Sequence, residues 1–450
     1  MMEDFPLWEQ GTRQTYPSLR GALQADVAIV GGGLTGISCA AMLSALGVKT
    51  VLLEARQLGR GASWNCTGKV TSQLAGVYQT IADAAGMDAA ATYARLMRQS
   101  MLDVRELCGK LQVPVQEHSV YVFAETTDDL PALHRMFDLQ KRLGLPVAMA
   151  KDAGGCPFPV ELALVTEHQL LLPPLIYLHA LAAFAAEQGC HIYENSPVRA
   201  IDGRQLFTPE GSVEAATILL ATGSPVGCMS LPRLCMMQQR TCATVTLEGN
   251  PPLLNSYLSV QPDELTLRPT QTGALLAWDM GRTGSGKREQ RQRILRRTMG
   301  ALLPEMHVQE SHIRQDVWSG DGLPLIGPIK PQQSYLWMAT GYSGWGVLNS
   351  HLAARCIAGH VTGHPLPEAS LFRPDRPSPK LPEGMRIAGA YLQGLTHLSA
   401  PTCPHMGGKL RYDPASQRWE CPCHGSTFTT MGETLDGPAM QPAEVSAKQR

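Results

Sequence analysis

The feature that most constrains the fold of this 450-residue chain is a glycine-rich turn near its N-terminal end. A β-branched run at 26–30 enters the turn Gly-Gly-Gly-Leu-Thr-Gly at 31–36, and residues 34–46 then have the composition of a helix. A second apolar run at 48–53 ends at Glu54. This order predicts a β-α-β unit, in which two parallel strands flank a helix.

The same unit has the features of a dinucleotide-binding site. Gly31 permits the sharp turn, Gly33 lets a pyrophosphate approach the backbone, and Gly36 lets helix and strand pack closely. The start of the helix directs N–H groups and a partial positive charge at the phosphates. Glu54 stands where a carboxylate would receive the ribose hydroxyls of an adenosine. The residues predicted to contact the dinucleotide here are Gly31, Gly33, Leu34, Thr35, Gly36 and Glu54.

Four later motifs bear on whether the dinucleotide is NAD or FAD, which the first motif leaves open. They are RGAS at 60–63, ILLATG at 218–223, DGLPLIG at 321–327 and ATGYSGWG at 339–346. In their order and spacing they resemble the D-amino-acid-oxidase-like family of FAD-dependent oxidoreductases, over about residues 20–365. The resemblance implies FAD.

The resemblance also implies further flavin contacts. In the family, a valine at the position of Val198 offers backbone groups to the adenine, and a glycine that ends a buried strand, here Gly223, lets the dinucleotide come close. Glycines at the start of the last helix can expose N–H groups to the flavin, although ordinary turn geometry also explains each glycine singly. Residues 317–320 lack the cysteine of covalent flavoproteins, so FAD is expected to be non-covalent. The implied contacts are Ala62, Ser63, Val198, Thr222, Gly223, Gly344 and Gly346.

Near the other end of the chain, cysteines and histidines form the pattern Cys-x-His, fifteen residues, Cys-x-x-His. Two thiolates can hold one iron of a 2Fe–2S cluster while two neutral imidazoles hold the other, and the histidines raise the reduction potential. Zinc is one alternative, although structural zinc sites more often use Cys-x2–4-Cys or His-x3–5-His pairs, and chance clustering is another. The predicted iron ligands are Cys403, His405, Cys421 and His424.

These ligands lie in two loops rich in proline and glycine, at 403–408 and 421–426, and a Gly-Pro-Ala segment follows at 437–439. The loops and this segment resemble the Rieske family over residues 385–450. The resemblance implies a small all-β domain around a 2Fe–2S cluster.

Two positions depart from the pattern of respiratory Rieske proteins. In those proteins a cysteine at the position of Gly408 forms a disulfide with the middle cysteine of the second loop, which is Cys423 here. Cys421 remains the expected ligand, because a switch to Cys423 would break the Cys-x-x-His spacing. Phe428 replaces a tyrosine that donates to the cluster, whereas Ser426 keeps the second hydroxyl, so a middling reduction potential is expected.

Composition excludes several classes of protein. The formal net charge of −1 gives no broad electrostatic case for binding nucleic acid or an anionic membrane. No apolar run is long enough to span a membrane, and the first residues lack the basic and apolar regions of a signal peptide, so a cytoplasmic protein is expected. Nine of the twelve cysteines are scattered singly and are expected to be reduced core thiols.

One stretch is strongly basic and has the composition of a helix. A solvated helix face explains it by default, and docking of an acidic redox partner is the alternative. The basic residues are Lys287, Arg288, Arg291, Arg293, Arg296 and Arg297.

The predicted fold is an α/β FAD-binding Rossmann-type domain with an inserted α+β substrate domain, followed by a small all-β Rieske domain. Residues 1–363 form the FAD-dependent part, 364–384 form a Pro-rich, semi-rigid linker, and 385–450 form the Rieske domain. The substrate-facing segments are assigned by elimination and by family analogy. The nucleotide-binding segments are about 20–79, 158–230 and 305–363, and the substrate-facing segments are about 80–157 and 231–304.

Together the two cofactors predict an enzyme that splits electron pairs. We expect an amine or amino acid to be oxidised by hydride transfer to FAD, with electrons passing singly to the cluster and then to an external acceptor or redox partner protein. Electron flow from cluster to flavin, in a reductase or oxygenase, and a redox- or iron-sensing role are the alternatives. No catalytic side chain can be named, because this chemistry needs mainly alignment of the C–H bond and a neutral substrate nitrogen. Cys66 is expected to be a buried, inert thiol, and a position near the flavin is the alternative.

Overall fold

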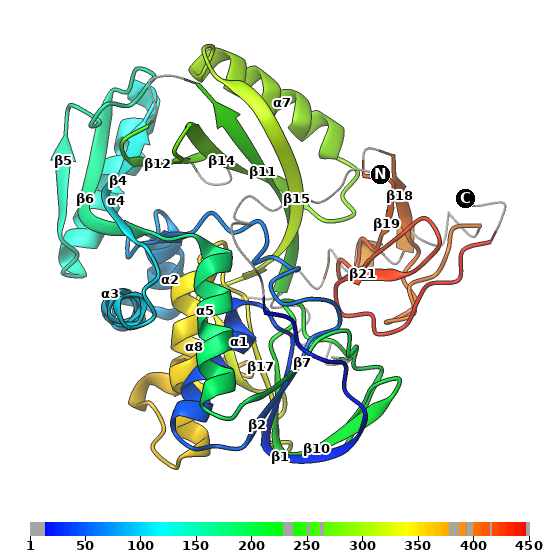
Figure 1. The fold of residues 1–450 in the computed structure, drawn as a ribbon. Coiled ribbons are helices and arrows are strands. Elements are labelled where there is room, and N and C mark those ends of the chain that lie inside the picture. Colours follow the sequence, from blue (N-terminus) through cyan, green and yellow to red (C-terminus); the bar gives the residue numbers. More distant parts are fainter. Residues whose placement is uncertain are drawn as a thin grey trace.

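The computed structural model describes residues 14–227, 237–249, 253–261, 265–377, 399–414 and 416–446, together with positions 385, 388–390 and 392–393. In these residues the strands form three sheets, of eight, nine and four strands. In Figure 1 the first sheet lies at the bottom, the second at the upper left, and the third, in orange and red, at the right.

The first sheet is mainly parallel and contains the predicted β-α-β unit. Its strand β1 (Gly21–Val30) pairs in parallel with β2 (Thr50–Leu53) on one side and with β10 (Gly211–Leu220) on the other. The order is β16-β17-β10-β1-β2-β7, with β9 beside β10 and β8 beside β9. The remaining strands are β7 (His191–Tyr193), β8 (Ala200–Asp202), β9 (Gln205–Phe207), β16 (Leu325–Pro328) and β17 (Leu336–Thr340).

Side chains of β1 enter two separate apolar cores, because successive residues of a strand point to opposite faces of the sheet. Val27 and Ile29 join the core on the side of three helices. Ala28 and Val30 join the core on the other face, against which Met406 of the C-terminal domain also packs. Both faces are therefore covered, as is usual for parallel strands. The three helices are α1 (Leu34–Ala45), α5 (Pro174–Glu187) and α8 (Gly346–Val361).

The second sheet is mostly antiparallel, with the order β15-β11-β14-β13-β12-β4-β6-β3 and β5 beside β6. Strands β3, β6 and β15 come from segments expected to be nucleotide-binding, so the chain crosses between the sheets inside those segments. The strands are β3 (Lys69–Val70), β4 (Gln116–Ala124), β5 (Val147–Ala150), β6 (Leu162–Leu171), β11 (Met237–Glu248), β12 (Ser256–Ser259), β13 (Thr266–Pro269), β14 (Gly273–Arg282) and β15 (His307–Ser319). The helices of this part are α2 (Val77–Ala85), α3 (Met87–Lys110), η1 (Thr127–Asp129), α4 (Leu130–Arg142) and α7 (Arg288–Leu302).

The third sheet is a small antiparallel unit with its own core. Trp419 and Phe428 from its strands are buried there together with Leu410. The sheet lies beside the lower ends of β11 and β15 in Figure 1, so the C-terminal domain contacts the rest of the chain instead of standing apart. The strands, in order, are β18 (Arg411–Asp413), β19 (Arg418–Glu420), β20 (Thr427–Phe428) and β21 (Thr434–Asp436).

The first half of the predicted linker packs on the FAD-dependent part. A short helix, η2 (Pro367–Phe372), places the Phe372 ring 6.3 Å from the Tyr93 ring, with Phe372 fully buried. The Arg376 guanidinium donates twice to the Asp321 carboxylate, at 2.8 Å each. Linker residues 378–384 lie outside the described residues. No helix in the described part of the chain is long and apolar enough to cross a membrane.

Candidate cofactor and substrate sites

The glycine turn after β1 depends on contacts that leave no room for side chains. Gly31 has a φ of +109°, and a Cβ there would lie 2.6 Å from the Ala221 carbonyl oxygen. A Cβ on Gly36 would lie 1.9 Å from the Gly31 carbonyl oxygen, so β1 and α1 approach this closely only because both positions are glycine. The Leu34 N–H at the start of α1 donates to Ser63 Oγ at 3.0 Å, which brings two predicted cofactor contacts together.

Glu54 is fixed by the backbone on both sides of its carboxyl group. Its two oxygens accept the N–H groups of Gly32 at 2.7 Å and of Arg56 at 2.8 Å. Burial raises the pKa of the Glu54 carboxyl, whereas these two hydrogen bonds lower it. The side chain is thereby held at the end of β2, the position expected for a ribose-binding acid.

A cavity of about 400 Å³ lies beyond the carboxyl ends of β1, β2, β10 and β17, and we call it the cofactor cavity. Ligands of open parallel sheets bind at this edge. Every predicted dinucleotide contact except Gly36 lines the cavity, and Gly36 instead packs against Gly31. The residues present fit an FAD: a turn without side chains, a helix N-terminus and a fixed carboxylate. The lining predicted contacts are Gly31, Gly33, Leu34, Thr35, Glu54, Ala62, Ser63, Val198, Thr222, Gly223, Gly344 and Gly346.

One wall of the cofactor cavity comes from the C-terminal domain, which the sequence did not predict. Arg56 Nη2 lies 3.8 Å from Asp436 Oδ1, and burial raises the pKa of the Asp436 carboxyl while Arg56 lowers it. No motif in residues 434–440 predicts this contact, because the contact depends on how the two domains dock. The wall residues are Thr434, Leu435, Asp436, Gly437, Ala439 and Met440.

A second cavity, of about 460 Å³, adjoins the cofactor cavity. Its other walls come from α2, α4 and the second sheet, including Trp278 and Trp318. This is the region expected to face the substrate. Both cavities are lined by Cys66, Thr67, Arg314, Asp316, Gly344 and Gly346.

Three ionisable groups line the second cavity: Lys69 is buried, and Arg314 and Asp316 are half-buried. Burial, together with the charges of Arg268 and Arg314, lowers the pKa of the Lys69 ammonium to about 7, and its Nζ hydrogen-bonds the Thr266 hydroxyl. Burial also raises the pKa of the Asp316 carboxyl, which Arg314 opposes. Among the described residues, the buried atoms Arg314 Nε and Asp316 Oδ2 have no hydrogen-bond partner. None of these groups was selected from the sequence, because burial, not a motif, sets their properties.

The four predicted iron ligands are brought together by two loops of the C-terminal domain. The Cys403 N–H donates to the Gly408 carbonyl at 2.8 Å, which closes the first loop. The Cys421 N–H donates to the Ser426 carbonyl, also at 2.8 Å, which closes the second loop. Each ligand side chain is buried, which suits an inorganic cluster shielded from water.

The ligands are arranged in two pairs. The Cys403 and Cys421 thiols contact each other, and the rings of His405 and His424 lie with centroids 5.2 Å apart and planes at 89°. A pair of sulfurs and a pair of imidazoles fit a 2Fe–2S cluster, in which each iron takes two protein ligands.

The two departures from the Rieske pattern lie directly at this site. A Cβ on Gly408 would lie 2.8 Å from Cys423 Sγ. Gly408 therefore faces Cys423, with which a cysteine at this position forms a disulfide in respiratory Rieske proteins. The Ser426 hydroxyl lies beside Cys403 and accepts the Ala439 N–H at 3.2 Å. Phe428 is fully buried and supplies no donor.

Comparison with known proteins shows the class. Residues 26–359 match the family of FAD dependent oxidoreductases, and residues 391–447 match the Rieske [2Fe-2S] domain. The chain therefore belongs to the FAD-dependent oxidoreductase family and carries a C-terminal Rieske domain. The predicted fold class, FAD and the 2Fe–2S cluster are confirmed.

Individual relatives share parts or all of this organisation. The chain is 26% identical to the putative Rieske 2Fe-2S iron-sulfur protein YhfW of Bacillus subtilis, over 97% of this chain and 96% of that protein. It is 25% identical to gamma-glutamylputrescine oxidoreductase of Escherichia coli, over 77% of this chain and 86% of that one. Among solved structures, glycine oxidase from Geobacillus kaustophilus superposes with a TM-score of 0.66, at 21% identity over 79% of this chain and 99% of the other. This last likeness concerns the fold.

Proposed function

We propose that this protein oxidises an amine or amino acid at FAD and passes the electrons one at a time through the 2Fe–2S cluster to an external one-electron acceptor. The names of two relatives, gamma-glutamylputrescine oxidoreductase and the glycine oxidase of Bacillus licheniformis, denote substrates of these two kinds. FAD can accept a hydride from the carbon next to nitrogen, leaving an imine that hydrolyses, and the cluster can accept single electrons.

The observation that carries the proposal is the position of the cofactor cavity between two other regions. On one side it adjoins the second cavity, with Arg314 and Asp316 in both walls. On the other side it is closed by residues 434–437, 439 and 440 of the Rieske domain. A substrate in the second cavity and a cluster in the Rieske domain would both lie next to one dinucleotide.

The ionisable groups of the second cavity suit a substrate with an amine and a carboxylate. The Arg314 guanidinium can bind a carboxylate with its planar fork, and Asp316 can accept a hydrogen bond from an ammonium group. A Lys69 amine with a pKa of about 7 is partly neutral at neutral pH and can take one proton from the substrate ammonium. The substrate nitrogen would then be neutral before its neighbouring C–H bond is broken.

Anaerobic stopped-flow mixing of the purified holoprotein with a panel of amines and amino acids tests the proposal. We expect one class of substrate to bleach the flavin absorbance, followed by the appearance of the reduced-cluster signal. Reduction of both centres only through a ferredoxin reductase would indicate the opposite direction of electron flow. Bleaching with a permanently oxidised cluster would support a sensing role for the cluster.

A further inference from the structure

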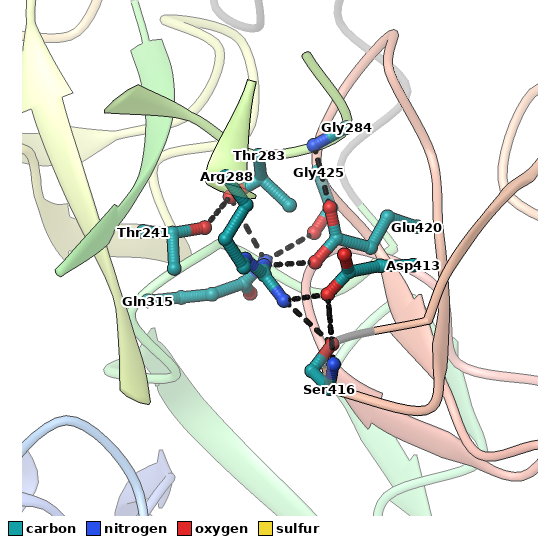
Figure 2. Close-up of polar contacts among 9 residues, drawn as sticks. All are labelled: Thr241, Thr283, Gly284, Arg288, Gln315, Asp413, Ser416, Glu420 and Gly425. Atoms are coloured by element: carbon teal, nitrogen blue, oxygen red, sulfur yellow. Dashed lines mark hydrogen bonds and ion pairs between the residues drawn. The ribbon is translucent and has the colours of Figure 1, made fainter. Parts of the chain in front are cut away.

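A buried arginine joins the FAD-dependent part to the Rieske domain. Arg288, the first residue of α7, is only 8% exposed. Its guanidinium forms ion pairs with the carboxylates of Asp413 and Glu420 and donates to Ser416 Oγ at 2.5 Å (Figure 2). The second oxygen of Glu420 accepts the Gly284 N–H at 2.8 Å. Two acidic groups of one domain are therefore neutralised by a single side chain of the other.

The backbones of the two parts are in direct contact beside this ion pair. A Cβ on Gly284, which follows β14, would lie 2.7 Å from Pro422 Cα in the second cluster loop. A Cβ on Gly425 would lie 2.3 Å from Cβ of Gln239 in β11. Both glycines have positive φ values, of +73° and +76°. The loop that holds His424 is thus seated on the FAD-dependent part with no space for an intervening side chain.

One polar side chain connects this contact to the cofactor cavity. Gln315, which lines the cavity from β15, donates through Nε2 to the Gly425 carbonyl at 2.8 Å and to Thr283 Oγ1 at 3.3 Å. Thr283 Oγ1 lies 3.0 Å from Thr241 Oγ1 (Figure 2). Gly425 directly follows His424 in the chain.

Contacts at other points resist rotation about the Arg288 ion pair. The Gly227 N–H donates to the Pro438 carbonyl at 3.2 Å, and Arg199 Nη1 donates to the Met440 carbonyl at 3.3 Å. Met406 of the first cluster loop packs against the apolar core beneath β1 and β10. The interface is therefore broad and includes both cluster loops.

We propose that the Rieske domain is a fixed electron acceptor, held by Arg288, rather than a head that swings on the Pro-rich segment. Gln315 is the positioning residue that sets the second cluster loop against the cofactor cavity. Arg288 of the basic helix α7 thus binds two carboxylates of the chain's own Rieske domain rather than an external redox partner. This inference rests on the proposed electron flow: each substrate gives two electrons, which the fixed cluster takes one at a time and passes to two one-electron acceptors.

The test compares Arg288→Met with Arg293→Met, which removes an exposed charge from the same helix. In the holoprotein, substrate should bleach the flavin of both variants, whereas cluster reduction should slow by about tenfold or more in Arg288→Met alone, because two buried carboxylates lose their partner. Arg288→Lys keeps the charge but lacks the planar guanidinium that donates to several acceptors, so its cluster reduction should be slowed to an intermediate degree. This variant serves as the test if Arg288→Met does not fold. Cluster reduction at the wild-type rate in a folded Arg288→Met protein would overturn the proposal.

A second measurement does not depend on turnover. Hydrogen exchange of the oxidised holoprotein should be faster in Arg288→Met at peptides containing Gly284 and Gly425, and unchanged in Arg293→Met. Unchanged exchange at both peptides in Arg288→Met would contradict the docking role even if no substrate were found, so failure of the proposed function is separately recognisable.

Insertion of ten Gly and Ser residues after Pro377 separates fixed from swinging behaviour. A swinging domain would transfer electrons at a rate that changes with linker length, because its effective concentration changes. A fixed domain predicts the wild-type rate after insertion, and a further loss only when the insertion is combined with Arg288→Met. A change of more than about twofold from the insertion alone would overturn the proposal.

Discussion

The two cofactor sites of this chain are built in opposite ways. The cluster site is local: its four predicted ligands lie between residues 403 and 424, and backbone hydrogen bonds close each loop by itself. The cofactor cavity draws its walls from Val30 to Met440, and the Rieske domain closes it. From this difference we expect loss of the cluster to leave the glycine turn and Glu54 in place, whereas changes in the glycine turn should empty the cofactor cavity.

The largest expected effect comes from removing a cluster ligand. Cys421→Ser should reduce the iron content from two per chain to near zero, because one iron loses a thiolate, while FAD content stays close to that of the wild type. Iron assay and visible absorbance measure both cofactors in one sample. Cys423→Ser is the matched control and should keep its iron. Loss of iron from Cys423→Ser with retention in Cys421→Ser would contradict the ligand assignment.

A change in the glycine turn should have the converse result. Gly36→Ala should abolish FAD retention and lower the free energy of unfolding by on the order of 3 kcal/mol, because its Cβ would meet the Gly31 carbonyl at 1.9 Å. Gly109→Ala, within α3, has no atom within 4 Å of the new Cβ and should be neutral or slightly stabilising. Flavin-to-protein ratio and chemical unfolding provide the two readouts. Normal FAD content in Gly36→Ala would refute the assigned role of this position.

The second cavity gives an effect on rate with a defined pH dependence. The folded-state pKa of Lys69, about 7, lies below its ordinary value, so the amine becomes neutral as pH rises through about 7. The rate constant for flavin bleaching should therefore rise over this range in the wild type. Lys69→Met and Lys69→Arg should lose this inflection and be slower above pH 7 by about a hundredfold. An unchanged profile in both variants would rule out Lys69 as the proton acceptor.

The same lysine makes a smaller contribution to stability. The cost of burying its ammonium is greatest below the folded-state pKa and decreases as pH rises toward the unfolded-state value. Lys69→Met should therefore raise the unfolding temperature more at pH 6 than at pH 9, as measured by calorimetry. An equal shift at both pH values would indicate that Lys69 is not charged in the folded protein at pH 6.

The smallest effect should come from linking the two cluster loops through residues that are not cluster ligands. A cysteine at 408 would place its Cβ 2.8 Å from Cys423 Sγ, so Gly408→Cys should form a disulfide under oxidising conditions and stabilise the domain by about 2 kcal/mol. Iron and FAD content should not change. The added stability should be lost in a reductant that leaves the cluster intact. It should also be absent from the double variant Gly408→Cys/Cys423→Ser. Added stability that persists in either case would show that the disulfide is not its cause.

The same contrast between local and assembled sites explains what could be predicted from the sequence. The glycine turn, Glu54 and the four cluster ligands could be predicted because their chemistry fixes both the residue type and the spacing over short stretches. The basic run at 287–297 left two alternatives open, and the choice for Arg288 depends on Asp413, 125 positions away. No feature of the sequence near Arg288 indicates a partner so far along the chain.

Other parts of the candidate site were beyond sequence reasoning for the same reason. The wall at 434–437, the unpartnered Nε of Arg314 and the lowered pKa of Lys69 arise from contacts between segments that carry no shared motif. Strands β6 and β15 belong to the second sheet although they lie in segments predicted to bind the nucleotide, because neither the mixed sequence of β6 nor the largely polar sequence of β15 carries a local signal for one sheet over the other.

The most direct test of the account follows the electrons of one substrate molecule. Anaerobic holoprotein is mixed with a substrate identified by flavin bleaching, frozen at successive times, and examined by electron paramagnetic resonance. We predict that the signal of the reduced cluster grows within the same turnover in which flavin absorbance falls, and that it is absent in Cys421→Ser. A cluster that stays oxidised throughout bleaching, although dithionite reduces it, would contradict the claim that the two cofactors form one electron path.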